Sequence, residues 1–405
     1  MDFSYLVLSS ESPLSKRASL EAGKLVKVPA ANLIEGEFTV KTVSSLKEFA
    51  AGLDAASWNQ CHVYGMFKDG ASSGRITAQT IKTKYPQRYA SYHTRTKREM
   101  AWSSSGGVLF LDYDPPKGEG MPPPLSKDAL IRALQGFAPF LDGVKLLWRP
   151  SSSSLLYNEE TGEELSGVRG QRIYILVDDA REIPRIGKLI YELSWLAGFG
   201  YFEVGKAGQL LERGLFDASV WQPERQDFIG GMVCEPPVQQ ARLDCRMPKN
   251  GRLEYLAVAL VPDLSPEQRT ELWTIKAKAK AAVSEEAQSV RNEYIELRAG
   301  EMVSKLKGLS HEERLAALDA ARRTVHESVE GGVLNGTFLL TCSNGRSVSV
   351  AELLAAPAKW NGARFFEPVE PGYGNDARIA WASLAGEEPY IFSHAHGGKR
   401  YQLRA

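Results

Sequence analysis

Three short apolar runs of strand-like length lie in the middle of the chain. They are VLFLDYD (residues 108–114), VKLLW (144–148) and RIYILV (172–177). Each is rich in β-branched or aromatic residues and is bounded by Gly, Pro or Ser, as buried strands commonly are. The pattern predicts three strands of a mixed sheet.

Helical periodicity lies between and after these runs. Residues 125–137 begin with Ser126 as a cap candidate, and residues 183–200 repeat apolar positions at three-to-four spacing before they end in glycines. Two glycine-containing stretches interrupt the pattern: 115–124 predicts a loop, and 158–170 predicts a hairpin or flap. The alternation predicts an α/β core with a mixed sheet, within an α+β (α/β) fold class.

The pattern changes near residue 250. From about residue 265 to His326 the chain is rich in Ala, Glu, Lys and Arg, which predicts long helices with a break near residue 308. Ser310 and Glu313 have the spacing of a capping box at the start of the second helical stretch. Short strand-like runs follow Gly331. The expected division is an N-terminal extension (1–35), a core (36–248), a helical domain (249–330) and a small C-terminal α/β domain (331–405).

Composition narrows the class of protein. Hydrophobic residues make up 43% of the 405 residues, and no run approaches the roughly 20 apolar residues of a membrane span. The apolar start has no basic residue ahead of it, so a signal peptide is not expected and a cytoplasmic location is. Four cysteines lack metal-ligand spacing, which favours free thiols.

The formal net charge is +0, so total charge makes no case for a nucleic-acid partner. A local basic segment nevertheless lies within residues 81–100, where tyrosines alternate with basic residues. The candidate DNA-binding residues are Lys82, Lys84, Arg88, Arg95, Lys97 and Arg98, with Tyr85, Tyr89 and Tyr92 between them. Such a mixture suits a surface that tracks a single strand and stacks its bases. The alternative is a solvated helix or loop face.

Two acids end the first predicted strand. Asp112 and Asp114 are two residues apart, so on a strand they project from the same face. Their carboxylates repel each other unless a cation lies between them, and a hard divalent ion takes such oxygen ligands. Two surface acids at a strand end are the simpler interpretation. Glycosyltransferases and phosphatases also use such a pair, although Pro116 does not fit the phosphatase pattern.

Further polar residues lie at other predicted strand ends. Ser151–Ser154 follow one strand, Arg172 begins another, and Asp217 follows an apolar pair further along, with Arg225 after it. If these strands are neighbours in one sheet, three acids and one basic residue converge.

These residues give the chain a resemblance to the archaeo-eukaryotic primase superfamily, in particular to the primase-polymerases of phages, plasmids and integrative elements that are often joined to a helicase. The superfamily pattern is a hydrophobic strand ending in D-x-D, then small-x-His, then hydrophobic-Asp. It falls here on VLFLDYD, on Gly170-Gln171-Arg172 and on Leu215-Phe216-Asp217. RPSSSS, KAGQLLERGLFD, V-x-x-PER-x-x-F and PYIFSHAHGGKRYQL also match. The resemblance covers roughly residues 30–245 and the last seventy.

The resemblance implies an RRM-like catalytic core and a DNA primase that makes primers on single-stranded DNA from NTPs or dNTPs, with a helicase partner in cis or in trans. Asp112, Asp114 and Asp217 would be catalytic and would hold Mg²⁺ or Mn²⁺. The residues expected to bind the nucleotide are Arg172, Ser152, Ser153, Lys206 and Arg225. Arg172 stands where the family has a histidine; a guanidinium binds phosphate but does not easily donate a proton.

Two other classes remain open. An origin-binding or initiator module would keep the fold, and Arg172 would then mark weak or lost catalysis. A different D-x-D transferase would act without a template. His394 and His396 are two apart, but no third ligand candidate lies nearby in the sequence, and the glycine-rich stretches lack the lysine of a phosphate loop.

Overall fold

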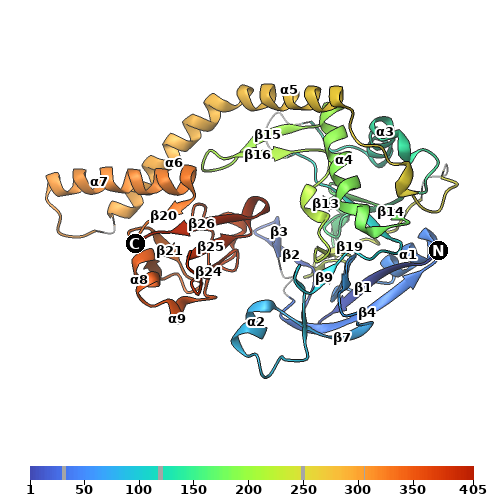
Figure 1. The fold of residues 1–405 in the computed structure, drawn as a ribbon, viewed down its shortest axis with the longest axis horizontal. Coiled ribbons are helices and arrows are strands. Elements are labelled where there is room, and N and C mark those ends of the chain that lie inside the picture. The colour runs from blue at the N-terminus through green and yellow to red at the C-terminus, as the bar shows by residue number, and fades with distance from the viewer. Residues whose placement is uncertain (30–32, 117–121, 248–250, 305) are drawn as a thin grey trace. The chain divides into compact units, whose positions relative to one another are not determined.

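A computed structural model describes residues 1–405 with the exception of 30–32, 117–121, 248–250 and 305. The chain forms two compact units (Figure 1). The first contains residues 1–200 and 214–275, and the second contains 201–213 and 276–405. The boundary between them falls inside one helix, α5 (Pro266–Ala282). The α+β class predicted above is confirmed.

A six-stranded sheet is the largest in the first unit. Its strands, in spatial order, are β17 (Gln226–Asp227), β5 (Gln60–Val63), β1 (Phe3–Ser9), β4 (Glu35–Val43), β7 (Ser73–Thr77) and β8 (His93–Thr94). The pairings are antiparallel except between β7 and β8. Its buried face includes Leu6, Leu8, Phe38 and Val63.

The position of β1 differs from the expected N-terminal extension. β1 lies between β4 and β5, inside the sheet, so residues 1–35 contribute to the core rather than precede it. The physical reason is that FSYLVLS alternates buried side chains, which a strand can bury only against partners from later in the chain.

A second sheet has three antiparallel strands, and these correspond to the three strands predicted from the apolar runs. Its order is β10 (Gly107–Tyr113), β14 (Gln171–Val177) and β11 (Leu147–Pro150). Every residue of β14 is buried, as expected for a central strand covered on both faces. The three predicted strands are therefore confirmed, although β11 begins three residues later than predicted.

Smaller sheets complete the first unit. Their strands are β2 (Lys16–Glu21), β3 (Lys24–Pro29), β6 (Met66–Phe67), β9 (Met100–Ala101), β12 (Leu156–Asn158), β13 (Glu164–Ser166), β18 (Val233–Cys234) and β19 (Val238–Gln240). The pairing of β12 with β13 confirms the predicted hairpin. The predicted 115–124 loop includes residues 117–121, which lie outside the described residues; its described ends have no regular structure.

Four helices flank these sheets. They are α1 (Leu46–Asp54), α2 (Gln79–Lys84), α3 (Lys127–Phe137) and α4 (Ile183–Leu196). The Ser126 hydroxyl accepts the Ala129 amide at the start of α3, which confirms the predicted cap. After α4, Gly198 adopts a φ of +84°, a conformation in which glycine ends a helix without strain.

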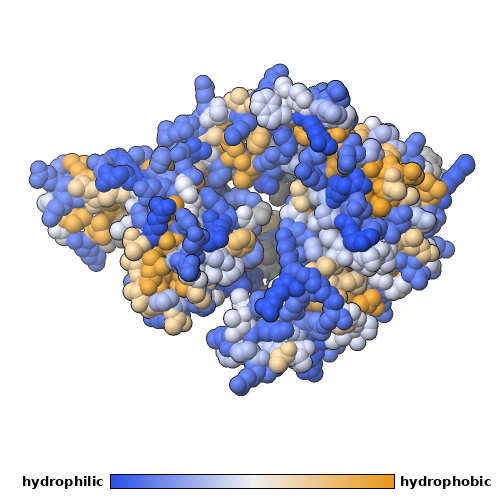
Figure 2. All heavy atoms as spheres, viewed as in Figure 1, coloured by the Kyte–Doolittle hydropathy of each residue, from blue (hydrophilic) through white to orange (hydrophobic). Residues whose placement is uncertain are grey.

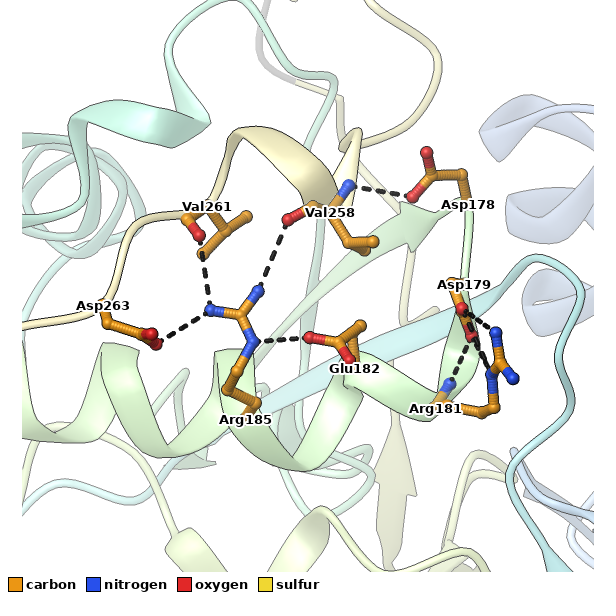
Figure 3. A network of polar contacts seen from close by, with 8 residues as sticks. All are labelled: Asp178, Asp179, Arg181, Glu182, Arg185, Val258, Val261 and Asp263. Carbon is orange, nitrogen blue, oxygen red and sulfur yellow. Dashed lines mark hydrogen bonds and ion pairs between the residues drawn. The ribbon is translucent and has the colours of Figure 1, made fainter.

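Ionic contacts fasten the segment 256–263 to the start of α4 (Figure 3). The Arg185 guanidinium donates to the carbonyls of Val258 and Val261 and pairs with Asp263 at 3.2 Å. The Val258 amide donates to the Asp178 carboxylate at 2.8 Å, just after β14. These contacts hold the end of the first unit against β14 and α4.

The second unit combines a hairpin, helices and a small sheet. The hairpin is β15 (Tyr201–Val204) with β16 (Leu210–Arg213), and the helices are α6 (Ser284–Ser304), α7 (His311–His326), α8 (Val350–Ala355) and α9 (Pro357–Trp360). Its remaining strands are β20 (Val333–Leu334), β21 (Leu339–Thr341), β22 (Ser347–Ser349), β23 (Arg364–Phe365), β24 (Ala380–Ser383), β25 (Tyr390–Ser393) and β26 (Lys399–Leu403). The five-stranded order is β20-β26-β25-β24-β23.

Several features of this unit were predicted. The capping box of Ser310 and Glu313 is present at the start of α7. The helical and C-terminal segments, however, belong to one compact unit, because α6 and α7 share a core with the small sheet. The four cysteines are free, as predicted. Among the described residues, no helix is long and apolar enough to cross a membrane.

Candidate functional site

Asp112 is the last outward-facing residue of β10. The residues before it from Gly107 to Leu111 are buried, whereas the Asp112 side chain is 22% exposed. In the register of the sheet Asp112 lies opposite Arg172 on β14. The guanidinium Nε of Arg172 is 3.6 Å from Asp112 Oδ1.

Asp217 reaches Asp112 through the backbone. The Asp217 amide donates to the Asp112 carbonyl at 2.9 Å, although 105 residues separate them in sequence (217 minus 112). The segment that follows is anchored on the same strand, because the Trp221 indole donates to the Phe110 carbonyl at 2.9 Å. The backbone of Asp217 therefore lies beside the strand that carries Asp112, while both of its carboxylate oxygens are bonded to Ser219.

Asp114 lies beside the serine turn. A Cβ atom added to Gly170 would stand 3.1 Å from Asp114 Oδ1 and 2.9 Å from Ser151 Oγ, so all three residues are neighbours. The Ser151 amide donates to the Gly170 carbonyl at 2.9 Å. The start of the serine-rich turn therefore lies close to Asp114.

A buried ion pair lies behind Asp112. Arg172 Nη1 is 2.7 Å from Asp227 Oδ1, and the side chains are 8% and 0% exposed. Arg172 Nη1 also donates a hydrogen bond to the Phe228 carbonyl at 2.7 Å. Asp227 Oδ1 accepts no hydrogen bond from the described residues, so its contact with Arg172 is an ion pair only. The hydroxyls of Tyr64 and Tyr174 donate to the other Asp227 oxygen at 2.6 and 2.8 Å.

Sequence reasoning missed Asp227 and Tyr64. Asp227 lies on β17 of the six-stranded sheet, and Arg172 lies on β14 of the three-stranded one, so their pair joins the two sheets. The available signal was an acid two residues after Arg225 in PERQDF, at the start of an apolar stretch. A buried acid needs a partner, but the sequence does not say which one.

Negative charge gathers around Asp112. Burial holds the pKa of the Asp112 carboxyl well above its ordinary value; Arg172 opposes this, and the carboxylates of Asp114, Asp227 and Asp217 add to it. Four carboxylates therefore act against one guanidinium. A divalent cation would relieve this repulsion.

The donor atoms fit such a cation in kind. Both Asp217 oxygens accept hydrogen bonds from Ser219, from its amide and its hydroxyl, each at 2.8 Å, and each oxygen keeps a second lone pair. Within the described ranges, however, no three His, Cys, Asp or Glu side chains are already arranged as a metal-ligand set. Carboxylates are the ligands that Mg²⁺ and Mn²⁺ take, so these residues fit such an ion in kind.

The residues predicted to hold the nucleotide are not all in one place. The Arg172 guanidinium is buried in the internal ion pair with Asp227 and also faces Asp112, so it is not free to meet a nucleotide. Ser152 is also buried, whereas Ser153 is partly exposed. Arg225 is exposed in the first unit, and Lys206 is exposed on the β15–β16 hairpin of the second.

The basic segment divides into two groups. Lys82 bonds to the Tyr92 carbonyl and lies 3.4 Å from Glu99, and Arg95 is largely buried and donates to the Glu224 carbonyl. Four basic side chains remain exposed: Lys84, Arg88, Lys97 and Arg98. Only this second group is placed to meet a DNA backbone.

His396 has a partner within the second unit. Its Nε2 lies 3.0 Å from Glu370 Oε1, which also accepts from Gln209 at 2.6 Å. Burial opposes ionisation of Glu370, but these two contacts outweigh it and lower its pKa. The pair is a structural contact of that unit.

Comparisons with protein-family models, with curated proteins and with solved structures give no match to this chain.

Proposed function

We propose that the first unit is a template-directed nucleotidyltransferase, a DNA primase-polymerase of the archaeo-eukaryotic primase type. The observation that carries the proposal is the hydrogen bond from the Asp217 amide to the Asp112 carbonyl at 2.9 Å. It supports a three-acid site, since it brings the third acid of the motif pattern beside the strand that carries the first two. The raised pKa of Asp112 supports the same grouping.

Asp112, Asp114 and Asp217 would hold Mg²⁺ or Mn²⁺, which when bound lowers the pKa of an attacking 3′-hydroxyl and neutralises the triphosphate. The protein's own part is positioning. The β10–β14 register fixes Asp112, the Ser219 hydrogen bonds orient Asp217, and Gly170 leaves room at Asp114. Such positioning and charge neutralisation account for most of phosphoryl-transfer catalysis.

The substrate and template contacts follow from the exposed basic residues. Ser153 and Arg225 are the accessible candidates for phosphate contacts on the first unit. Lys84, Arg88, Lys97 and Arg98 would track the single-stranded template. A helicase in cis or in trans would supply that strand.

A second candidate function is a catalytically weak DNA-binding or initiator module. The observation that favours it is the buried state of Arg172, which replaces the histidine of the family pattern with an internal counter-ion for Asp227. In that case the acids would stabilise the fold and DNA binding would be the whole activity.

Primer synthesis on single-stranded DNA with Mg²⁺ or Mn²⁺ separates the two. Asp112→Asn and Asp217→Asn should each lower synthesis at least about a hundredfold while DNA binding persists. Asp142→Asn is the matched control, because Asp142 is an exposed acid that follows a short helix elsewhere in the unit. No synthesis by the wild-type protein with either metal, together with intact DNA binding, would favour the initiator module.

A further inference from the structure

A pocket of about 440 Å³ opens between β8 and the region after α2. Four charged side chains line it, Lys68, Asp69, Lys82 and Glu99, together with Tyr92 and His93. The surface around α2 is mostly hydrophilic (Figure 2). Its volume is in the range of small-molecule sites, and it adjoins the exposed basic residues of the template-tracking segment.

Asp69 is a fixed acceptor at the wall of this pocket. Its Oδ1 accepts the Ala71 amide at 3.1 Å, and its Oδ2 accepts from His93 Nε2 at 2.7 Å. The His93 ring is held in turn against Phe38 and Phe67, with ring centroids 5.0 and 4.5 Å away. The carboxylate is nevertheless 59% exposed.

The remaining capacity of Asp69 can be counted. A carboxylate has about four lone-pair sites, two on each oxygen. One site on each oxygen is used by Ala71 or His93, so one on each oxygen is left. The carboxylate can therefore accept one further hydrogen bond at each oxygen.

The charges of the pocket balance. Lys68 donates to the Lys97 carbonyl at 2.9 Å, and Lys82 is held by the Tyr92 carbonyl and by Glu99. Two lysines face two carboxylates, so a phosphate gains little from entering. A neutral ligand that carries both hydrogen-bond donors and acceptors fits better.

Of two neighbouring tyrosines, Tyr92 lines the same pocket and Tyr89 packs against it from outside the lining. The Tyr92 hydroxyl accepts from Arg75 at 3.0 Å, and the Tyr89 ring meets the Tyr92 ring edge-on with centroids 4.9 Å apart. The Arg75 guanidinium lies over this ring, 5.7 Å from its centroid, so a flat heterocycle would stack on the ring from its other side. Neutral, flat and hydrogen-bonding together describe a nucleobase.

We propose that this pocket binds one guanine base of single-stranded DNA, with Asp69 as the residue that selects it. Guanine carries two adjacent donors, N1–H and N2–H, which match the two open acceptor sites of Asp69. Adenine, cytosine and thymine each present an acceptor beside their donor on that edge. The inference rests on the proposed function only in taking the DNA as a polymerase template, and it would make guanine a preferred position for starting synthesis.

Binding of oligonucleotides to the full chain tests the proposal without requiring synthesis. The probe is a fluorescent oligothymidylate of about 15 nucleotides, with its central base replaced by guanine, adenine or hypoxanthine. Guanine should tighten binding roughly tenfold over plain oligothymidylate, and adenine should not. Hypoxanthine lacks the N2 amino group and should lose most of the gain.

The protein variants complete the test. Asp69→Asn should remove the preference for guanine but leave the affinity for plain oligothymidylate unchanged, and Asp142→Asn should keep both. Equal affinities for all four oligonucleotides would overturn the proposal, as would a guanine preference that survives in Asp69→Asn. The hypoxanthine probe alters only the DNA, so it remains decisive if the variant folds poorly.

Failure of the proposed polymerase function can be distinguished from failure of the guanine pocket. A wild-type protein that prefers guanine but makes no primer with either metal would refute the polymerase and leave the pocket standing. Synthesis that starts equally at all template bases, together with no guanine preference in binding, would refute the pocket and leave the polymerase standing.

Discussion

The guanidinium of Arg172 lies 2.7 Å from the carboxylate of Asp227, and together they connect two sheets whose strands are far apart in sequence. The pair has little access to water, and two tyrosine hydroxyls donate to the Asp227 oxygen that does not face Arg172. Arg172 also faces Asp112 at 3.6 Å, so a single cation links the interior of the fold to the candidate site. The position of Asp112 therefore depends on the buried Arg172–Asp227 ion pair, which lies behind the candidate site.

Removing the Arg172 guanidinium should lower the stability of the protein. Arg172→Gln would leave Asp227 and Asp112 as uncompensated acids, and breaking a buried pair in this way destabilises proteins by about 3–5 kcal/mol. We expect that loss in the urea-unfolding free energy of the first unit. Arg242→Gln is the control, because Arg242 pairs with Asp244 at 2.7 Å but is 77% exposed, so its loss should be within about 1 kcal/mol. Equal effects of the two substitutions would contradict a structural role for the buried pair.

Close packing of α4 on Trp221 should matter for the position of Asp217. A Cβ atom on Gly187 would lie 2.2 Å from the Trp221 ring, whose indole holds the segment after Asp217 on β10. Gly187→Ala should cost about 1–3 kcal/mol and lower any activity of the acid site. Thermal unfolding and primer synthesis measure both effects.

Gly136 offers the matched control within α3. A Cβ atom there would meet no atom within 4 Å. Since alanine favours a helix interior over glycine, Gly136→Ala should stabilise the protein by about 0.5–1 kcal/mol. Stabilisation by both substitutions would show that the α4–Trp221 contact is not tight.

His62 should make stability depend on pH. Burial lowers its pKa from an ordinary value of 6.5 to about 3; Asp227 opposes the shift, and Arg149 adds to it. Below pH 6.5 the unfolded chain therefore binds a proton that the folded chain does not, and stability falls as the pH falls.

The size of the effect is measurable by a comparison with His62→Gln. Between pH 7 and pH 5 the wild-type protein should lose about 2 kcal/mol more unfolding free energy than the variant, whose side chain does not titrate. Urea unfolding at the two pH values gives both numbers. Parallel pH profiles for the two proteins would show that the pKa of His62 is the same in the folded and unfolded states.

Local patterns predicted the parts of the fold that local physics decides. The strands that became β10 and β14 were visible because they are short apolar runs, and Ser126 and Ser310 were visible as caps because they satisfy nearby amides. Pairing at long range was not visible. Nothing near Phe3–Ser9 indicates that it lies between β4 and β5.

At the candidate site, too, local patterns were visible in the sequence and long-range pairing was not. Asp112, Asp114 and Asp217 stood out by their motif spacing, and the Asp217–Asp112 hydrogen bond agrees with the expected convergence. Arg172 was expected to face a ligand, because an arginine at a strand end gives no sign of which acid it will meet. Its partner Asp227 comes from another sheet, and only the tertiary fold brings the two together.

Metal binding by the acid site can be measured apart from catalysis. Mn²⁺ titrated into the protein and followed by electron paramagnetic resonance should show a bound fraction in the wild type and in Asp142→Asn. Asp112→Asn and Asp217→Asn each remove one carboxylate from a site where burial, and then the neighbouring acids, raise the pKa of Asp112, so each should weaken Mn²⁺ binding at least about tenfold. Chelation by EDTA should abolish synthesis and return of Mn²⁺ should restore it. Wild-type affinity for Mn²⁺ in both variants would mean that these acids repel one another without holding a cation, and the three-acid site would lose its basis.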